Sequence, residues 1–354
     1  MKVEIVSEKE EQAWDKMVKE HPFGSVFQTS CFKKVLAETF PQTKPYYLAL
    51  VDQKGDMKGG MPIFLVRSWL TGTRLVSLPF AFYSDPLIQS KEEFERLFVT
   101  IMRIYKEEGA SYLEIKVRDS TMLLRKIGSL TPVFYHKTYF LDLTEGLDNI
   151  WKKLHKDCIQ RKIRRAKKNG ITVRTATSED DVLSFWRLLV KTRKRLGLPP
   201  QNCSYFENIW KYLTPLQLAD FLIAEIGNEI IGGVNTFKFK NTVYLGYVAS
   251  KTEYWPLGVD QALLWQAIQA GADGGYEVFD IGKTSPFANG LITYKKRWGG
   301  QELETPCFYY PSLKGVSSLN NERKLTYRIT TFMWKRLPDP VLRMGGRFAY
   351  RHLG

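Results

Sequence analysis

One segment of the chain combines a strand end, a polar loop and a short basic helix: FDIGKTSPFANGLITYKKRWGG, residues 279–300. Its apolar strand residues end near Gly282, and helical residues are expected from about Asn289. Lys295 falls one turn into that helix. Active sites in mixed sheets lie at strand ends, and an ammonium there would stabilise negative charge that develops on a carbonyl oxygen. Lys295 is therefore a candidate catalytic residue that could reach back toward the strand end.

The alternative interpretation of Lys295 is a solvated side chain. It begins a KKR run, and most lysines are exposed. In either case the sequence predicts an exposed lysine whose replacement costs little stability. The nearby Trp298 is expected to pack inside the protein, because most tryptophans are largely buried.

The elements that must position this segment occur twice. The first half predicts a hairpin, a helix and a strand over residues 46–52, 60–67, 92–108 and 112–117. The second half predicts three strands, a helix and a strand over 221–226, 230–239, 242–249, 258–272 and 276–281. Glycine pairs at 59–60 and 232–233 occupy matching places. The nearly constant offset favours duplication of one unit, although this element order is also common in unrelated α/β proteins.

A mixed sheet with helices packed on it, built twice, is the expected α/β fold class (α+β mixed sheets). The predicted domains are 1–144 and 145–313, the second carrying the chemistry. Residues 314–354 form a third, shorter segment, a basic tail whose helical spacing is broken at Pro338 and Pro340.

The most basic stretch of the second half is residues 151–170, with nine Lys or Arg against one acid. We expect one helix over 148–169. Its apolar residues share one face, and its basic residues lie on the opposite face: Ile159, Ile163 and Ala166 against Arg161, Arg165 and Lys168. The basic face is either a solvated surface or a site for a polyanion.

Three segments in order resemble the FemABX aminoacyltransferases and their BioF2-like GNAT acetyltransferase relatives. SVFQTSCFKK, residues 25–34, is similar to an N-terminal "FQS, aromatic, lysine" segment of that family, and RKIRRAKKNG, residues 161–170, to its RxxIRRAxxxG helix. The run at 279–300 is similar to its FK-plus-WG signature, with Tyr294 in the place of the phenylalanine. The resemblance covers about residues 20 to 312.

The resemblance implies tandem duplicated GNAT-like domains and direct transfer of an activated acyl group to an amine. The donor would be aminoacyl-tRNA or acyl-CoA, and the acceptor a cell-envelope or glycan/peptide precursor that is sometimes lipid-linked. Lys295 matches the lysine that steadies the donor carbonyl oxygen. The implied substrate-binding residues are Lys34 and Arg161, which match residues that hold phosphates or carboxylates, Tyr247 and Tyr294, which match aromatics, and Asp85, which falls near an acceptor-binding acid.

The chain also departs from the family pattern. No long coiled-coil arm separates the halves. A Q/R-x-x-G-x-G/A pyrophosphate loop is also missing before the helix expected at Gly258, where YWPLG stands instead. A coenzyme A donor would thus lose its usual cradle of backbone amides at a helix start.

Composition narrows the possible classes further. The net charge of +15 raises the local concentration of polyanions such as tRNA, coenzyme A or an anionic membrane. The four cysteines are scattered, so neither a metal site nor a permanently bound cofactor is expected. No DNA partner is expected. Because no apolar run approaches the roughly 20 residues of a membrane span and no signal peptide is evident, we expect a cytoplasmic protein.

The tail alternates aromatic and basic residues, as interfacial anchors do. It either docks on the inner face of the membrane or packs on the second domain. Three functions remain open: the Fem-like acyl or aminoacyl transferase, an acyl-CoA-dependent N-acetyltransferase acting on an amino sugar or amino acid, and a non-catalytic basic membrane-associated binding module.

Overall fold

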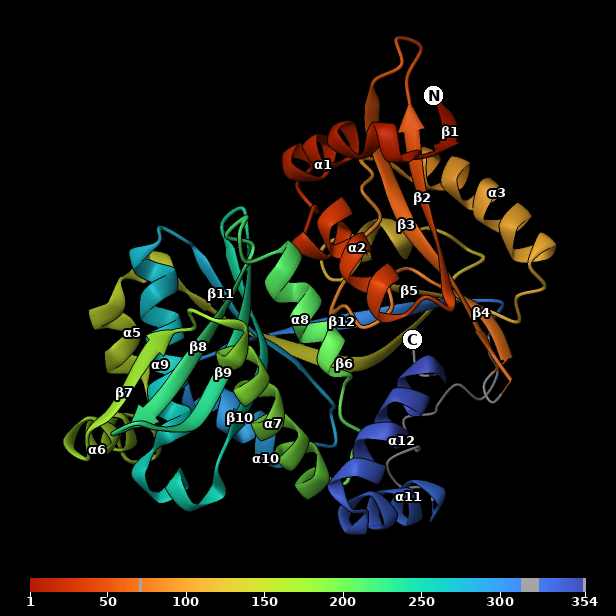
Figure 1. Ribbon diagram of the computed structural model, residues 1–354. Coiled ribbons are helices and arrows are strands. Elements are labelled where there is room, and N and C mark those ends of the chain that lie inside the picture. The colour runs from red at the N-terminus through yellow and green to blue at the C-terminus, as the bar shows by residue number, and fades with distance from the viewer. Residues whose placement is uncertain (70–71, 313–324, 353–354) are drawn as a thin grey trace. The chain divides into compact units, whose positions relative to one another are not determined.

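The computed structural model describes residues 1–69, 72–312 and 325–352. By their contacts, the described residues form two compact units. The first contains residues 1–136, 304–312 and 348–352, and the second contains 137–303 and 325–347. The predicted α/β fold with mixed sheets is confirmed in both units (Figure 1).

The first unit holds a mixed sheet in the order β1-β2-β3-β4-β5-β12. All neighbours are antiparallel except β4 and β5, which are parallel. Its strands are β1 (Lys2–Ile5), β2 (Thr43–Val51), β3 (Met57–Ser68), β4 (Gly72–Val76), β5 (Leu113–Lys116) and the end of β12 (Gln301–Tyr310). Its helices are α1 (Glu11–Glu20), α2 (Ser30–Thr39), α3 (Lys91–Glu107) and α4 (Thr121–Leu124).

The second unit repeats this arrangement in the order β7-β8-β9-β10-β11-β6, with β10 and β11 as the parallel pair. Its strands are β7 (Ile171–Thr175), β8 (Ala219–Ile226), β9 (Glu229–Phe239), β10 (Thr242–Ser250), β11 (Val278–Thr284) and the end of β6 (Thr131–Asp142). Its helices are α5 (Leu147–Lys153), α6 (Arg161–Lys168), α7 (Glu179–Leu196), α8 (Cys203–Tyr212), α9 (Val259–Asp273), α10 (Asn289–Arg297) and α11 (Leu325–Arg336). Helix α12 (Asp339–His352) begins in this unit.

The last strand of each unit comes from the other half of the sequence. Strand β6 follows β5 in the chain but pairs with β11, whereas β12 follows β11 but pairs with β5. The compact units are therefore not contiguous stretches such as 1–144 and 145–313. Sequence periodicity finds strands but not their partners, so the exchange carries no local signal.

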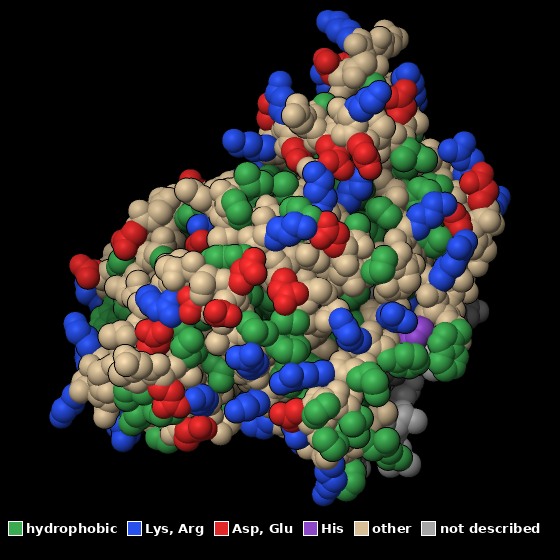
Figure 2. All heavy atoms as spheres, in the orientation of Figure 1, with side chains coloured by type: hydrophobic (Ala, Val, Ile, Leu, Met, Phe, Trp, Pro, Cys, Tyr) green, Lys and Arg blue, Asp and Glu red, His purple; other side chains and the backbone are tan. Residues whose placement is uncertain are grey.

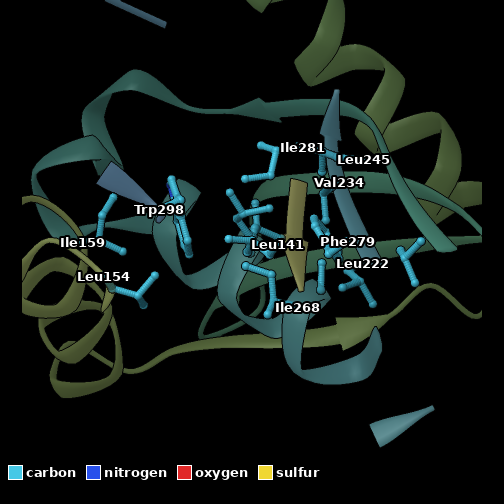
Figure 3. Close-up of a cluster of buried hydrophobic side chains, with 14 of the residues drawn as sticks. Leu141, Leu154, Ile159, Leu222, Val234, Leu245, Ile268, Phe279, Ile281 and Trp298 are labelled. Carbon is cyan, nitrogen blue, oxygen red and sulfur yellow. The ribbon is translucent and has the colours of Figure 1, made fainter. Parts of the chain in front are cut away.

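Helices cover both faces of each sheet. In the first unit α3 packs on the face that carries Leu48 and Leu50, and Trp14 of α1 packs on the other face. In the second unit α9 packs against Ile231 and Val243 within one large apolar cluster (Figure 3). Alternation along the strands places apolar side chains on both faces, as expected for sheets covered twice.

The matched glycine pairs have the same structural role. A Cβ at Gly60 would lie 2.7 Å from the ring of Trp14, and a Cβ at Gly233 would lie 2.9 Å from the ring of Phe185. In both units a helix aromatic thus packs directly on the hairpin backbone. This equivalence agrees with the predicted duplication.

One predicted helix differs from the structure, and one strand of the first unit was not predicted. The single helix expected over 148–169 is interrupted, because Leu154 and His155 take extended backbone angles between α5 and a short π-helical turn, Lys156–Gln160. Its predicted faces are confirmed, since Ile159 and Ala166 are buried and Arg161 is exposed. Strand β4 was missed, because its five residues are too short for a clear alternation.

The tail contains the two helices predicted around Pro338 and Pro340. The remaining predicted tail residues, 314–324 and 353–354, lie outside the described part of the chain. In the ranges that the structure covers, no helix is both long and apolar enough to cross a bilayer.

Candidate active site

The ladder between the parallel strands β10 and β11 is short. Their register covers residues 242–244 of β10 and 278–280 of β11, although the strands continue to Ser250 and Thr284. Both strands are irregular just beyond that point, β10 between Leu245 and Val248 and β11 between Asp280 and Gly282 in its pairing with β6. Backbone groups at the ends of β10 and β11 are therefore released from regular pairing with each other.

Gly282 forms the turn in β11 that the sequence predicts. Its φ of +84° lies in the left-handed region that favours glycine. The buried carboxylate of Asp280 stabilises this turn, because its Oδ1 accepts hydrogen bonds from the Gly282 amide at 2.6 Å and from Thr138 Oγ1 at 3.0 Å. The irregularity is thus held by side-chain contacts from two strands.

Lys295 reaches back from α10 to this turn. Its Nζ donates to the carbonyl oxygens of Gly282 at 2.6 Å and Lys283 at 3.1 Å, and lies 5.6 Å from the ring centroid of Tyr139. The side chain is only 4% exposed, so the prediction of an exposed lysine is wrong. In an isolated helix all three residues of a KKR run would be solvated. Here α10 packs against β11, and this packing buries Lys295, the first residue of the run.

Burial lowers the pKa of Lys295 from 10.5 to about 8, and the negative charge of Asp280 opposes that shift. An ammonium has three N–H donors. Among the described residues its hydrogen-bond acceptors are the two carbonyls, which leaves the third donor without an acceptor. A buried donor of this kind stabilises developing negative charge more strongly than a solvated one.

Three further predicted residues lie in the same unit. Tyr294 is half-buried against the core beside Trp298, whose predicted packing role is confirmed (Figure 3), and burial raises the pKa of Tyr294. Tyr247 lies in the irregular part of β10, two residues beyond Leu245, whose carbonyl oxygen approaches Gly282. Its ring packs on Phe206 of α8.

Arg161 lies on the exposed face of α6, where it pairs with Asp157 at 3.4 Å. This face borders an open hollow of about 520 Å³ whose lining is almost entirely basic. The lining residues are Arg161, Lys162, Arg164, Arg165, Lys168, Asn169 and Pro256. A cluster of five cations around one concave surface is suited to a phosphate-bearing ligand.

The remaining two predicted residues, Lys34 and Asp85, belong to the first unit. Lys34 is about half exposed and lies 3.5 Å from a carboxylate oxygen of Glu11. Asp85 is 3% exposed, and its carboxylate accepts hydrogen bonds from the backbone amides of residues 118–120. Burial and the nearby Asp119 raise the pKa of Asp85 to about 6. In the structure Asp85 holds the loop at residues 118–120 in place. Its backbone oxygen also accepts a hydrogen bond from the side-chain amide of Gln28, in the segment that resembles the family's "FQS" motif.

The N-terminus of α9 is covered by other parts of the unit. A Cβ at Gly258, which precedes α9, would lie 2.4 Å from the carbonyl oxygen of Lys162 in α6. The side chain of Asp260 is half-buried in the first turn, where Ser250 Oγ donates to its carboxylate at 2.5 Å. The preceding residues 252–257 form a 3-10 helix containing Pro256. A phosphate group is thus denied the usual cradle of a helix start.

Sequence reasoning missed several residues of this site. The position of Asp280 could have indicated its role, because an acid within the apolar run FDI is unusual for a buried strand. Thr138 and Tyr139 carry no such signal, because β6 reaches β11 only through the exchange of strands. Asp260 carries no signal either, because acidic residues are common in the first turn of a helix.

Comparisons with known proteins agree with this architecture. Residues 155–296 match the family model described as Acetyltransferase (GNAT) domain. A comparison with curated proteins finds no match. Among solved structures, FemX has a TM-score of 0.72 at 17% identity, and the alignment covers 90% of this chain and 99% of that one.

Two further structures share the fold at lower similarity. L-PGS from Bacillus licheniformis has a TM-score of 0.60 at 13% identity over 94% of this chain and 99% of its own. A tandem GNAT protein from the clavulanic acid biosynthesis pathway has a TM-score of 0.54 at 9% identity over 87% of this chain and 98% of its own. The tandem arrangement predicted from the sequence is therefore that of known double-domain structures.

Proposed function

We propose that this chain, a FemABX/GNAT-type protein with a GNAT acetyltransferase domain in its second unit, is an N-acyltransferase. It moves an activated acyl or aminoacyl group to an amine of a cell-envelope or glycan/peptide precursor in the cytoplasm. The observation that carries the proposal is the buried ammonium of Lys295 at the turn of β11, with one donor left for a ligand.

In this reaction the acceptor amine attacks the donor carbonyl carbon. A C–N bond forms, the donor's C–O or C–S bond breaks, and the leaving oxygen or sulfur takes the electron pair and, overall, the proton that the amine loses. Lys295 donates a hydrogen bond to the carbonyl oxygen as it becomes negative. Loss of one such donor costs about 100-fold to 1,000-fold in turnover.

Five other residues contribute to substrate binding in this proposal. Arg161 contacts phosphate groups at the basic hollow, and Lys34 contacts an acidic group of the acceptor. Tyr247 and Tyr294 provide aromatic surface beside the ends of β10 and α10. Asp85 acts indirectly, because its oxygens are already engaged in holding the loop at 118–120.

The covered N-terminus of α9 favours an aminoacyl-tRNA donor over coenzyme A. A GNAT domain that held coenzyme A at this helix would need the space that Lys162 fills, and the carboxylate of Asp260 would repel a pyrophosphate. The basic hollow beside Pro256 offers an anion site in its place. The family model itself favours the second candidate, acyl-CoA-dependent N-acetyl transfer, because its matched residues include this region.

Thermal unfolding with each donor separates the two candidates. We expect the 3′-terminal minihelix of a tRNA to raise the melting temperature, with an affinity that falls steeply as salt increases, because phosphate contacts release counterions. Coenzyme A at the same concentration should leave the melting temperature unchanged. Protection by coenzyme A and none by the minihelix would instead support the acetyltransferase.

The transfer itself is tested with a small-molecule extract as a source of acceptors. Wild-type protein, extract and an aminoacyl-tRNA pool should yield a product that gains an aminoacyl mass and survives hydroxylamine, as an amide does and an ester does not. Protein that produces no such mass increment with either aminoacyl-tRNA or acyl-CoA would contradict the proposal.

A further inference from the structure

The C-terminal helices α11 and α12 form a helical hairpin. One side of this helical hairpin packs on the second unit. Thr331 packs on Gly197, and Trp334 packs on Gly345, so that α11 and α12 also pack on each other. Lys194 of α7 pairs with Asp339 at 2.8 Å. Leu342 is fully buried. Packing on the second domain, one of the two alternatives that the sequence leaves open for the tail, is therefore observed for this side.

The opposite side of the hairpin is apolar and exposed. Five large hydrophobic side chains, between 41% and 68% exposed, lie there at helical spacing: Ile329, Phe332 and Met333 on α11, and Val341 and Met344 on α12. Figure 2 shows hydrophobic side chains gathered over these helices. The positions i, i+3 and i+4 on α11 and i and i+3 on α12 place each set on one helix face. We call these five residues the tail patch.

Basic residues border the tail patch. Lys335, Arg336 and Arg347 are exposed, and the guanidinium of Arg336 lies 3.5 Å from the ring centroid of Phe332. Arg343 instead lies against α7, with its guanidinium 4.9 Å from the ring centroid of Trp186. The two helices contain a single acid, Asp339, which is already paired with Lys194. The surface thus combines an apolar centre with cations and no unpaired acid.

This combination identifies the partner by its chemistry. A second copy of the chain on a twofold axis would bring the same cations together, because such an interface pairs a surface with itself. An anionic bilayer accommodates both features, since its acyl chains accept the apolar side chains and its phosphates pair with the cations. We propose that the tail patch docks the protein on an anionic lipid surface. This inference does not rest on the transferase proposal.

Flotation with lipid vesicles tests the docking. The wild-type protein should float with vesicles of phosphatidylcholine mixed with phosphatidylglycerol and remain in solution with phosphatidylcholine alone. Added salt should weaken the binding, because it screens the contribution of the cations. Wild-type protein that stays in solution with the anionic vesicles would overturn the proposal.

Two variants locate the contact. The double substitution Phe332→Ser/Met333→Ser should reduce vesicle binding by about 10-fold or more, because it removes two inserted side chains. Leu216→Ser is the matched control, since Leu216 is also 56% exposed in the second unit but lies in the loop before β8. Circular dichroism should show unchanged folding for both variants.

The following outcomes would overturn the proposal or assign the tail patch to another partner. Equal vesicle binding by the double variant and the wild type would overturn the proposal, and so would a larger loss in the Leu216→Ser control. A wild-type dimer in light scattering that becomes a monomer in the double variant, without vesicle binding, would assign the tail patch to a second copy instead.

Discussion

At the scale of single residues, the environment of Lys295 determines what its substitution measures. Replacement by methionine removes a buried charge, which is favourable, but leaves the carbonyls of Gly282 and Lys283 without their donor, which costs about 1–3 kcal/mol. Because these effects oppose each other, Lys295→Met should change the free energy of unfolding by less than about 2 kcal/mol. Lost activity in this variant can therefore be separated from unfolding.

The lowered pKa of Lys295 predicts that the stability of the protein depends on pH. Between about 8 and 10.5 the unfolded chain binds more protons at this lysine than the folded protein does, so the free energy of unfolding rises with pH across that window. The rise relative to Lys295→Met should approach about 3 kcal/mol. Urea unfolding of both proteins at pH 7.5 and 10.5 measures it, and the comparison cancels other titrating groups. A constant difference would mean that Lys295 is solvated.

Activity should respond to the same proton in the opposite direction. Turnover should decline as pH rises through about 8, because deprotonated Lys295 stabilises a negative oxygen less effectively. The Lys295→Met variant should lack this decline in its residual rate.

At the scale of elements, the turn at Gly282 connects the sheet to the chemistry. Gly282→Ala would place a Cβ 3.9 Å from Lys295 Nζ and force alanine to adopt a positive φ, at a cost of roughly 1–2 kcal/mol. Gly275→Ala is the matched control, because Gly275 also has a positive φ of +76° but opens onto empty space. Both should lose similar stability in urea unfolding, and only Gly282→Ala should also lose turnover. Equal turnover in the two variants would mean that the turn at Gly282 has no part in the reaction.

The elements also show what the sequence can predict. The hairpins, α9, β11 and α10 follow from apolar periodicity and glycine positions, and the predicted start of α10 near Asn289 is confirmed. Lys295 was singled out correctly as reaching the strand end, but its burial depends on tertiary packing that a KKR run does not reveal. The same is true of Asp85, whose partners are more than thirty residues away in sequence.

At the scale of the whole molecule, the exchange of β6 and β12 predicts that the halves depend on each other. Residues 1–144 alone lack β12 beside β5, and residues 145–313 alone lack β6 beside β11, so each fragment exposes a strand edge and part of its core. Each fragment should unfold at lower urea concentration than the full chain or aggregate. Circular dichroism and limited proteolysis measure this. Two independently stable fragments would contradict the dependence.

The most direct test of the central claim compares two adjacent lysines. Lys296 is exposed and pairs with Glu302, whereas Lys295 is buried at the turn of β11. With a substrate preparation on which the wild type forms amide product, Lys295→Met should lose about 100-fold or more in turnover, and Lys296→Met should retain wild-type turnover. Wild-type turnover by folded Lys295→Met would contradict the assignment of Lys295 as the catalytic residue.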